Sequence, residues 1–222
     1  MSPSAIKYVT FDCYGTLTHF QIQSVTRQLI SDRVSAGRMD AFLTDFSNYR
    51  RDEVIGPWKP YDQVLSDALE RTCKLWAIEF RAEDGAAIYK AVPTWGPHPD
   101  VIEPLIEIAK TIPLVIFSNA SDSQIMQNVE LLKAPFHAVF TAQQAGAYKP
   151  RLAAFEYMFD QLGCTPADVA HVSASMRYDL IPATDLRIPT RIYVNRGYEP
   201  VTPYYCTHTI RDLSGLADCL NM

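Results

Sequence analysis

The sequence predicts an α/β protein: a Rossmann-like parallel sheet core with an inserted α-helical cap. Three observations predict this. A β-branched and aromatic run, residues 6–11, precedes a turn-like Cys-Tyr-Gly; residues from about 21 to 90 keep helical spacing without a convincing strand; and beyond about residue 95, short apolar runs alternate with helical patterns. We therefore expect residues 1–18 and 95–222 to form the core domain and residues 19–94 to form the cap domain.

The first strand and the cap are predicted from apolar spacing. Residues 6–11 are apolar enough for a buried strand. In the cap, Ile22, Val25 and Leu29 keep helical spacing, as do Leu65, Leu69 and Trp76 further along. Gly56-Pro57-Trp58-Lys59-Pro60 interrupts the pattern, and its glycine and prolines predict a loop between helices.

The second half of the chain predicts the remaining core elements. Strands are expected at residues 112–117, 138–141, 169–173 and 190–194. Helices are expected around Pro104, after a cap at Ser121 or Asp122, and across Leu152–Leu162. Thr165-Pro166 predicts the start of a further helix, with the threonine as cap and the proline in the first turn.

Composition excludes several classes of protein. The chain has 222 residues, is 48% hydrophobic and carries a net charge of -5 without a basic run, so nucleic acid is not an expected partner. Its five cysteines are scattered and form no CxxC pair, which is typical of a reduced cytoplasmic protein without disulfides or structural zinc. The start of the chain lacks a signal-peptide pattern, and no apolar run is long enough to predict a membrane span or a membrane partner.

Chemically active residues fall where the predicted strands end. Asp12 follows the first strand, Ser118 and Asn119 follow the strand at 112–117, and Asp179 closes the segment after the strand at 169–173. Ligands of parallel α/β sheets bind beyond the carboxyl ends of the strands. We therefore expect these residues, together with Lys149 from a loop, to form the site.

These residues carry a resemblance to a known family. The segment Phe11-Asp12-x-Tyr14-Gly15-Thr16-Leu17 resembles the first motif of the haloacid dehalogenase superfamily. Ser118-Asn119 resembles its second motif, Lys149-Pro150 its third, and Ser175-x-x-x-Asp179 its fourth. All four occur in order, and the resemblance covers essentially the whole chain. It implies the haloacid dehalogenase fold and a covalent aspartate nucleophile at Asp12.

Two departures indicate the branch of the superfamily. Most members are magnesium-dependent phosphohydrolases with a second aspartate two residues after the nucleophile, where this chain has Tyr14. Those enzymes also begin the fourth motif with Gly-Asp, where this chain has Ala174 in place of the aspartate. Magnesium binds hard oxygen ligands such as carboxylates, and neither Tyr14 nor Ala174 supplies a carboxylate. Both departures agree with the 2-haloacid dehalogenases (type II). This chain resembles that branch because its first motif has the same pattern, Asp-x-Tyr-Gly-Thr-Leu.

The resemblance implies hydrolytic, metal-independent removal of halide from short (S)-2-haloalkanoic acids, with no cofactor. Asp12 would displace the halide, and water would then hydrolyse the resulting ester. Lys149 would keep Asp12 ionised, and Asp179 would hold Lys149 and help to activate the water. Thr16 and Ser118 would fix Asp12, and Asn119 would cradle the halide. The backbone of Cys13 and Tyr14, with the Ser118 hydroxyl, would bind the substrate carboxylate. Ser175 belongs to the same predicted catalytic set.

Other residues are assigned less directly. Arg50, in preference to Arg51, is expected to bind halide from the cap, and Trp58 and Tyr178 are candidates for the substrate wall or for the core. Met176 and Phe155 replace an asparagine and a tyrosine of well-studied relatives. We interpret His171 as a packed histidine. The resemblance also implies a homodimer.

Two other functions stay open from sequence alone. One is a phosphatase, or another hydrolase of the same superfamily, with degraded metal ligands. The other is a non-catalytic binding protein on the same fold. Each motif residue also has a structural interpretation: Asp12 as a turn residue, Ser118-Asn119 as a helix cap, and Lys149 as a solvated loop lysine.

Overall fold

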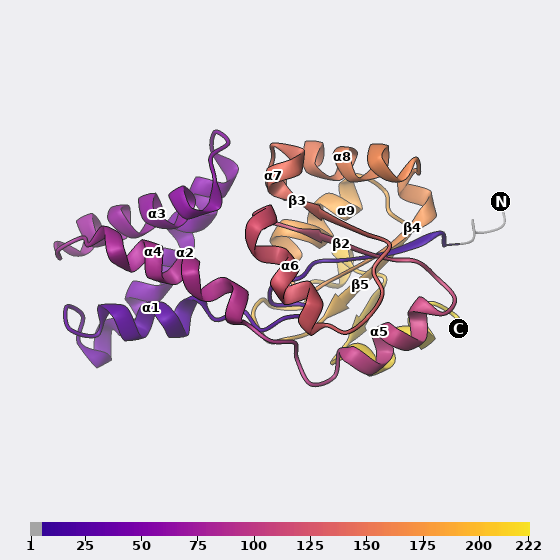
Figure 1. Ribbon diagram of the computed structural model, residues 1–222, viewed down its shortest axis with the longest axis horizontal. Coiled ribbons are helices and arrows are strands. Elements are labelled where there is room, and N and C mark those ends of the chain that lie inside the picture. The colour runs from indigo at the N-terminus through magenta and orange to yellow at the C-terminus, as the bar shows by residue number, and fades with distance from the viewer. Residues whose placement is uncertain (1–5) are drawn as a thin grey trace. The chain divides into compact units, whose positions relative to one another are not determined.

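The computed structural model describes residues 6–222 and divides into two compact units. One unit extends to His19 and resumes from Gly96 to Met222; the other is the continuous segment Phe20–Trp95. The first is an α/β unit and the second is helical (Figure 1). The chain thus leaves the α/β unit soon after its first strand and returns before the second.

The α/β unit contains a six-stranded sheet in the order β3-β2-β1-β4-β5-β6, and every pair of neighbours is parallel. The strands are β1 (Tyr8–Phe11), β2 (Leu114–Ser118), β3 (Ala138–Thr141), β4 (Val169–Ser173), β5 (Thr190–Val194) and β6 (His208–Ile210). The predicted parallel α/β fold is confirmed. The short β6 was missed because its three residues, His-Thr-Ile, are mostly exposed and carry no apolar run.

Both faces of this sheet are covered, because alternate side chains along β2 belong to two different buried apolar clusters. Leu114 and Ile116 belong to one buried apolar cluster, and Val115 and Phe117 belong to another. Successive side chains of a strand point to opposite faces, so a strand buried on both faces needs a continuous apolar run. The helices of this unit are α5 (Ile102–Ala109), α6 (Asp122–Leu131), α7 (Ala142–Ala145), α8 (Leu152–Leu162), α9 (Ile181–Asp185) and α10 (Leu216–Cys219).

One predicted helix is wrong. The segment after Thr165 makes only a 3-10 turn, Pro166–Asp168, before β4 begins. Thr165 does cap it as expected, because the Asp168 carboxylate accepts hydrogen bonds from the Thr165 N–H and hydroxyl, both at 2.8 Å. The chain enters β4 at Val169, directly after this closed turn, which leaves no residues for a longer helix.

The helical unit consists of α1 (Ile22–Ile30), α2 (Met39–Ile55), α3 (Tyr61–Trp76) and α4 (Ala82–Ala91), and the loop predicted at residues 56–60 separates α2 from α3. Phe42 and Phe46 on α2 and Leu65 and Leu69 on α3 are fully buried. Their helical spacing explains why the apolar pattern was readable from sequence. Among residues 6–222, no helix combines the length and the apolar character that crossing a membrane requires.

Candidate active site

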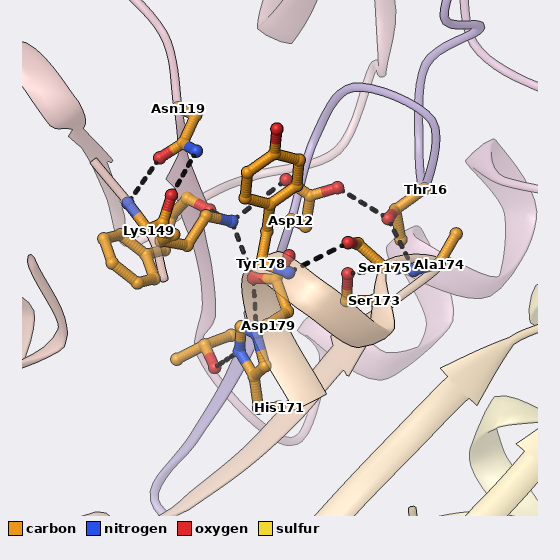
Figure 2. Close-up of polar contacts among 12 residues, drawn as sticks. Asp12, Thr16, Asn119, Lys149, His171, Ser173, Ala174, Ser175, Tyr178 and Asp179 are labelled. Carbon is orange, nitrogen blue, oxygen red and sulfur yellow. Dashed lines mark hydrogen bonds and ion pairs between the residues drawn. The ribbon is translucent and has the colours of Figure 1, made fainter. Parts of the chain in front are cut away.

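The topology of the sheet brings four chain segments to one edge. β1 lies between β2 and β4, so Asp12 after β1, Ser118 at the end of β2 and the turn after β4 are neighbours at the carboxyl ends of the strands. Lys149 enters from the loop between α7 and α8. Figure 2 shows the Lys149 ammonium joined by polar contacts to both Asp12 and Asp179.

Lys149 is the centre of the site. Its side chain is 1% exposed. Its Nζ lies 3.0 Å from Oδ1 of Asp12 and 2.7 Å from Oδ1 of Asp179, and it donates to the Phe117 carbonyl at 2.8 Å. Burial lowers the pKa of Lys149, but the two carboxylates raise it more, so the net shift is upward. The ammonium is therefore retained in the interior and all three of its protons have acceptors.

The Asn119 side chain holds the backbone of Lys149. Its Nδ2 donates to the Lys149 carbonyl at 2.9 Å, and its Oδ1 accepts from the Lys149 N–H at 2.8 Å. This pair of bonds fixes the residue that bridges the two carboxylates. The structural work of Asn119 was not foreseen, and its expected contact with halide stays a prediction.

Asp12 is held at both oxygens. Oδ1 faces Lys149, and Oδ2 accepts from the Thr16 hydroxyl at 2.8 Å. The Thr16 oxygen in turn accepts from the Ala174 N–H at 2.8 Å, which ties the first motif to the fourth. Burial raises the pKa of Asp12 and Asp179 raises it further, against the opposing effects of Lys149 and Thr16. The result is a poorly solvated carboxylate that is more basic than an ordinary aspartate.

Asp179 is fully buried and its two oxygens differ. Oδ1 contacts Lys149 and lies 3.0 Å from Nε2 of His171, whereas Oδ2 has no hydrogen-bond partner within residues 6–222. Burial raises the pKa of Asp179, but Lys149 and His171 lower it more, so this carboxyl stays ionised. An ionised oxygen without a donor is suited to accept a proton.

His171 is a site residue whose contact with the site sequence reasoning missed. It is fully buried in β4, between Asp179 at Nε2 and the Thr10 hydroxyl, 2.8 Å from Nδ1. It is packed, as predicted, but it is also bonded to a residue of the site. A signal existed: buried ring nitrogens need partners, and a histidine two residues before the end of a buried strand lies near that strand's carboxyl edge.

Ser118 is 1% exposed, and its hydroxyl is buried without a partner in the described part of the chain. A buried polar group left unpaired costs about 1–3 kcal/mol. The hydroxyl is therefore available to a polar ligand that reaches it.

Ser175 closes the turn that carries Asp179. Its hydroxyl accepts from the Tyr178 N–H at 3.1 Å and donates to Oε1 of Glu199 at 3.2 Å. Oε2 of Glu199 accepts from the N–H groups of Met176 and Arg177, at 3.1 and 3.2 Å. The predicted catalytic role of Ser175 is untested. Its contacts are those of a cap, with Glu199 as an unpredicted clamp.

Cys13 and Tyr14 directly follow the nucleophile in the chain and add no carboxylate. Burial, reinforced by Asp12, raises the pKa of the Cys13 thiol to about 12, so it is no thiolate at neutral pH. The Tyr14 hydroxyl donates to Oδ1 of Asn128 on α6 at 2.9 Å. Tyr178 is half-buried. The expected substrate contacts of these three residues stay predictions.

Two predicted residues belong to the helical unit. Arg50 is buried, with its guanidinium carbon 4.9 Å from the Phe20 ring centre, and its Nη1 has no hydrogen-bond partner within the described chain. Trp58 is 37% exposed and Arg51 donates to Asn48. A buried arginine nitrogen without an acceptor agrees with anion binding. The roles of Arg50 and Trp58 toward substrate remain predictions.

Magnesium, which many proteins of this fold use, does not fit these residues. The position that would carry the metal-binding aspartate of the fourth motif is Ala174, whose backbone N–H is engaged by Thr16. Asp179 is already bonded to an ammonium and an imidazole. Within residues 6–222, no group of three or more His, Cys, Asp or Glu side chains is arranged to hold a metal ion.

Comparison with known proteins agrees with the motifs. The chain is 28% identical over 178 residues to the (S)-2-haloacid dehalogenase of Xanthobacter autotrophicus, covering 77% of this chain and 68% of that protein. An L-2-haloacid dehalogenase structure superposes with a TM-score of 0.83 at 21% identity, covering 99% of this chain and 100% of that one. A Bacillus subtilis hydrolase of the same superfamily, solved with magnesium, gives 0.82 at 15% identity over 99% and 100%.

These two structural likenesses establish the fold alone, because one neighbour is a dehalogenase and the other a magnesium-bound hydrolase. The family follows from the sequence. The family model of haloacid dehalogenase-like hydrolases matches residues 6–185, which include all four motifs and the helical unit between the first two. The chain therefore belongs to the haloacid dehalogenase-like hydrolases.

Proposed function

We propose that the protein is an (S)-2-haloacid dehalogenase that converts short 2-haloalkanoic acids to 2-hydroxy acids without a metal. The observation that carries this is the composition of the buried site. Asp12 is bonded to an ammonium, Lys149, and the positions of the usual second and third carboxylates are Tyr14 and Ala174. When a carboxylate attacks a phosphate ester, the leaving alcohol oxygen needs a general acid, and a metal offsets the phosphate charge, whereas halide leaves as a stable anion without either.

In the first step, Asp12 attacks the halogen-bearing carbon. An oxygen of Asp12 forms a C–O bond as the C–halogen bond breaks, and the halide departs with the bonding electrons. The partial desolvation and raised pKa of Asp12 make this carboxylate a better nucleophile than a solvated one. Lys149 stabilises its ionised form through Oδ1, and Thr16 fixes its orientation through Oδ2.

In the second step, water hydrolyses the Asp12 ester at the carboxyl carbon. Oδ2 of Asp179 accepts a proton from the water, and the ester oxygen leaves Asp12 with its electron pair and is protonated to give the hydroxy acid. The open lone pairs of Oδ2 support its assignment as the base, and the lowered pKa keeps Asp179 in the ionised form that can accept a proton.

The substrate carboxylate is assigned to Ser118, whose buried hydroxyl lacks a partner in the described chain, and to backbone N–H groups around Cys13 and Tyr14. Arg50 is the preferred halide contact of the cap. The choice of a 2-haloacid, its (S) configuration and a homodimeric assembly rest on resemblance, of which the Xanthobacter enzyme is the named example.

The test is halide release from each enantiomer of 2-chloropropionate, and from fluoroacetate, with EDTA present. We expect release from the (S) enantiomer and about one Asp12 ester per site in acid-quenched enzyme, detected by peptide mass. Asp12→Asn is the matched inactive control, because it keeps the size of the side chain. Absence of halide release, combined with magnesium-dependent hydrolysis of a phosphate ester, would instead identify a phosphatase.

A further inference from the structure

His171 is buried beside the site but has no role in the two steps proposed for Asp12. Asp12, Lys149 and Asp179 together carry one net negative charge, and none of the three residues is more than 8% exposed. An uncompensated charge in the interior is costly. A proton on the His171 imidazole would make this buried group neutral overall.

The surroundings of His171 accommodate it in both protonation states. In the neutral ring, Nε2–H donates to Asp179 and the Thr10 hydroxyl donates to Nδ1. In the imidazolium, Nδ1–H donates to the Thr10 oxygen, and the hydroxyl turns to the Ala170 carbonyl at 3.3 Å. Once a proton is added at Nδ1, the hydrogen bonds around the ring adjust by rotation of the Thr10 hydroxyl.

Within residues 6–222, two other side chains near His171, Phe155 and Arg191, are not competing proton acceptors. The Phe155 ring on α8 lies 5.6 Å from its ring centre, edge to face. On β5, Arg191 is the register partner of His171, and its guanidinium donates to the carbonyls of Ile188 and Tyr205. The charged groups on the site side are Asp179 and, beyond it, Lys149 and Asp12.

We propose that His171 is the positioning residue for hydrolysis of the Asp12 ester: it holds Oδ1 of Asp179, leaves Oδ2 to meet water, and takes up the proton that hydrolysis releases. This rests on the proposed function, because the step begins from an ester. While Asp12 is esterified, Lys149 and Asp179 balance each other and His171 is neutral. When hydrolysis restores the Asp12 carboxylate, protonation of His171 restores neutrality.

The step balances in atoms and charge. Water supplies the new C–O bond at Asp12 and two protons, while the bond between the carboxyl carbon and the ester oxygen breaks. One proton ends on the hydroxyl of the 2-hydroxy acid. The other is lost from the new carboxylic acid of Asp12, and one proton is taken up at Nδ1 of His171, because Nε2 already carries the hydrogen bonded to Asp179. Alkylation in the next cycle returns that proton to solvent.

The first test separates alkylation from hydrolysis in single turnovers. His171→Gln keeps a neutral side chain with an N–H group but cannot take a second proton, and His171→Leu removes both. With (S)-2-chloropropionate, we expect the halide burst to persist in both variants, while decay of the Asp12 ester slows at least tenfold and its pH profile loses the acidic limb of wild type. His208→Gln, on exposed β6, is the matched control.

A second test does not depend on turnover or on a substituted His171. In ¹⁵N-histidine-labelled protein, the ring nitrogens of His171 report its protonation as pH is varied. Asp12→Asn removes one negative charge, so we expect His171 to protonate at lower pH in that variant than in wild type. Equal midpoints, or wild-type ester decay with an unchanged pH profile in His171→Gln, would overturn the proposal. Failure of wild type to form any ester would instead refute the proposed function.

Discussion

Replacing Lys149 with methionine tests the claim that one ammonium holds two buried carboxylates in place. Methionine nearly matches lysine in length but donates no hydrogen bond. The variant loses contacts to Asp12 and Asp179 and the bond to the Phe117 carbonyl. Because both carboxylates are buried, water cannot replace the lost ammonium.

The expected magnitude follows from this burial. Removing one partner of a buried ion pair costs about 3–5 kcal/mol, because a buried charge is left uncompensated. For a chain of this size, each kcal/mol lowers Tm by about 2–4 °C, which gives a decrease of about 6–20 °C at pH 7. Lys110→Met is the control, because Lys110 forms an exposed pair with Glu107 and its loss should cost about 1 kcal/mol at most.

The pH dependence gives the prediction a sign. Without Lys149, the pKa values of Asp12 and Asp179 rise in the folded state. The loss of folding stability is therefore present at pH values above these raised pKa values, and it disappears as pH falls through them and the carboxylates are protonated. Thermal melts followed by circular dichroism at pH 7 and pH 5 should therefore show a smaller difference from wild type at pH 5. Equal differences at both pH values, or a loss no larger than that of Lys110→Met, would refute the reasoning.

Four further outcomes are expected. Ser118→Ala should raise KM for 2-chloropropionate about tenfold without lowering Tm, since its hydroxyl has no partner within the described chain to lose; a large drop in Tm would contradict this. Burial lowers the pKa of His98 to about 4, so as pH falls from 6.5 the unfolded chain is protonated at this residue before the folded protein is, which destabilises the fold. Thermal melts should therefore show that His98→Gln loses less stability than wild type between pH 6.5 and 4, and equal losses would argue against this. Because the pKa of Asp12 is raised, the acidic limb of kcat/KM should lie above pH 3.8, and a limb at or below that value would be inconsistent with the buried nucleophile. Glu199→Ala removes three hydrogen bonds to the turn that carries Asp179 and should lower kcat about tenfold, with faster hydrogen exchange in residues 174–179; unchanged exchange would count against the clamp.

The α/β fold could be predicted because its signals are local. A strand covered on both faces needs a continuous apolar run, and Leu114–Phe117 supplies one. The loop at Gly56 is equally local. β6 escaped prediction because its pairing with β5, through Ile192 and His208, depends on residues far apart in sequence. Its own residues gave no periodic signal.

The main residues of the candidate site could be named from sequence, but most of the hydrogen bonds among them could not. Asp12, Lys149 and Asp179 were named from motifs, and the structure brings their charged atoms together. The two hydrogen bonds between Asn119 and the Lys149 backbone join residues 30 positions apart, and no spacing rule predicts such a pair. Glu199 clamps the fourth motif from beyond β5, outside any motif segment.

His171 shows why charge balance has to be evaluated in three dimensions. In sequence it is a single histidine in an apolar strand, and packing is the ordinary interpretation. The motifs contribute two carboxylates, Asp12 and Asp179, and one ammonium, Lys149, so these three buried side chains together carry one net negative charge. This net charge matters because the three side chains are buried, so solvent cannot compensate it, and their burial is known only from the structure. The imidazole, 3.0 Å from Asp179, is the described side chain bonded to this group to which we assign the balancing proton. In the cycle we propose, the nucleophile alternates between an anion and a neutral ester, and His171 is the partner whose charge alternates with it.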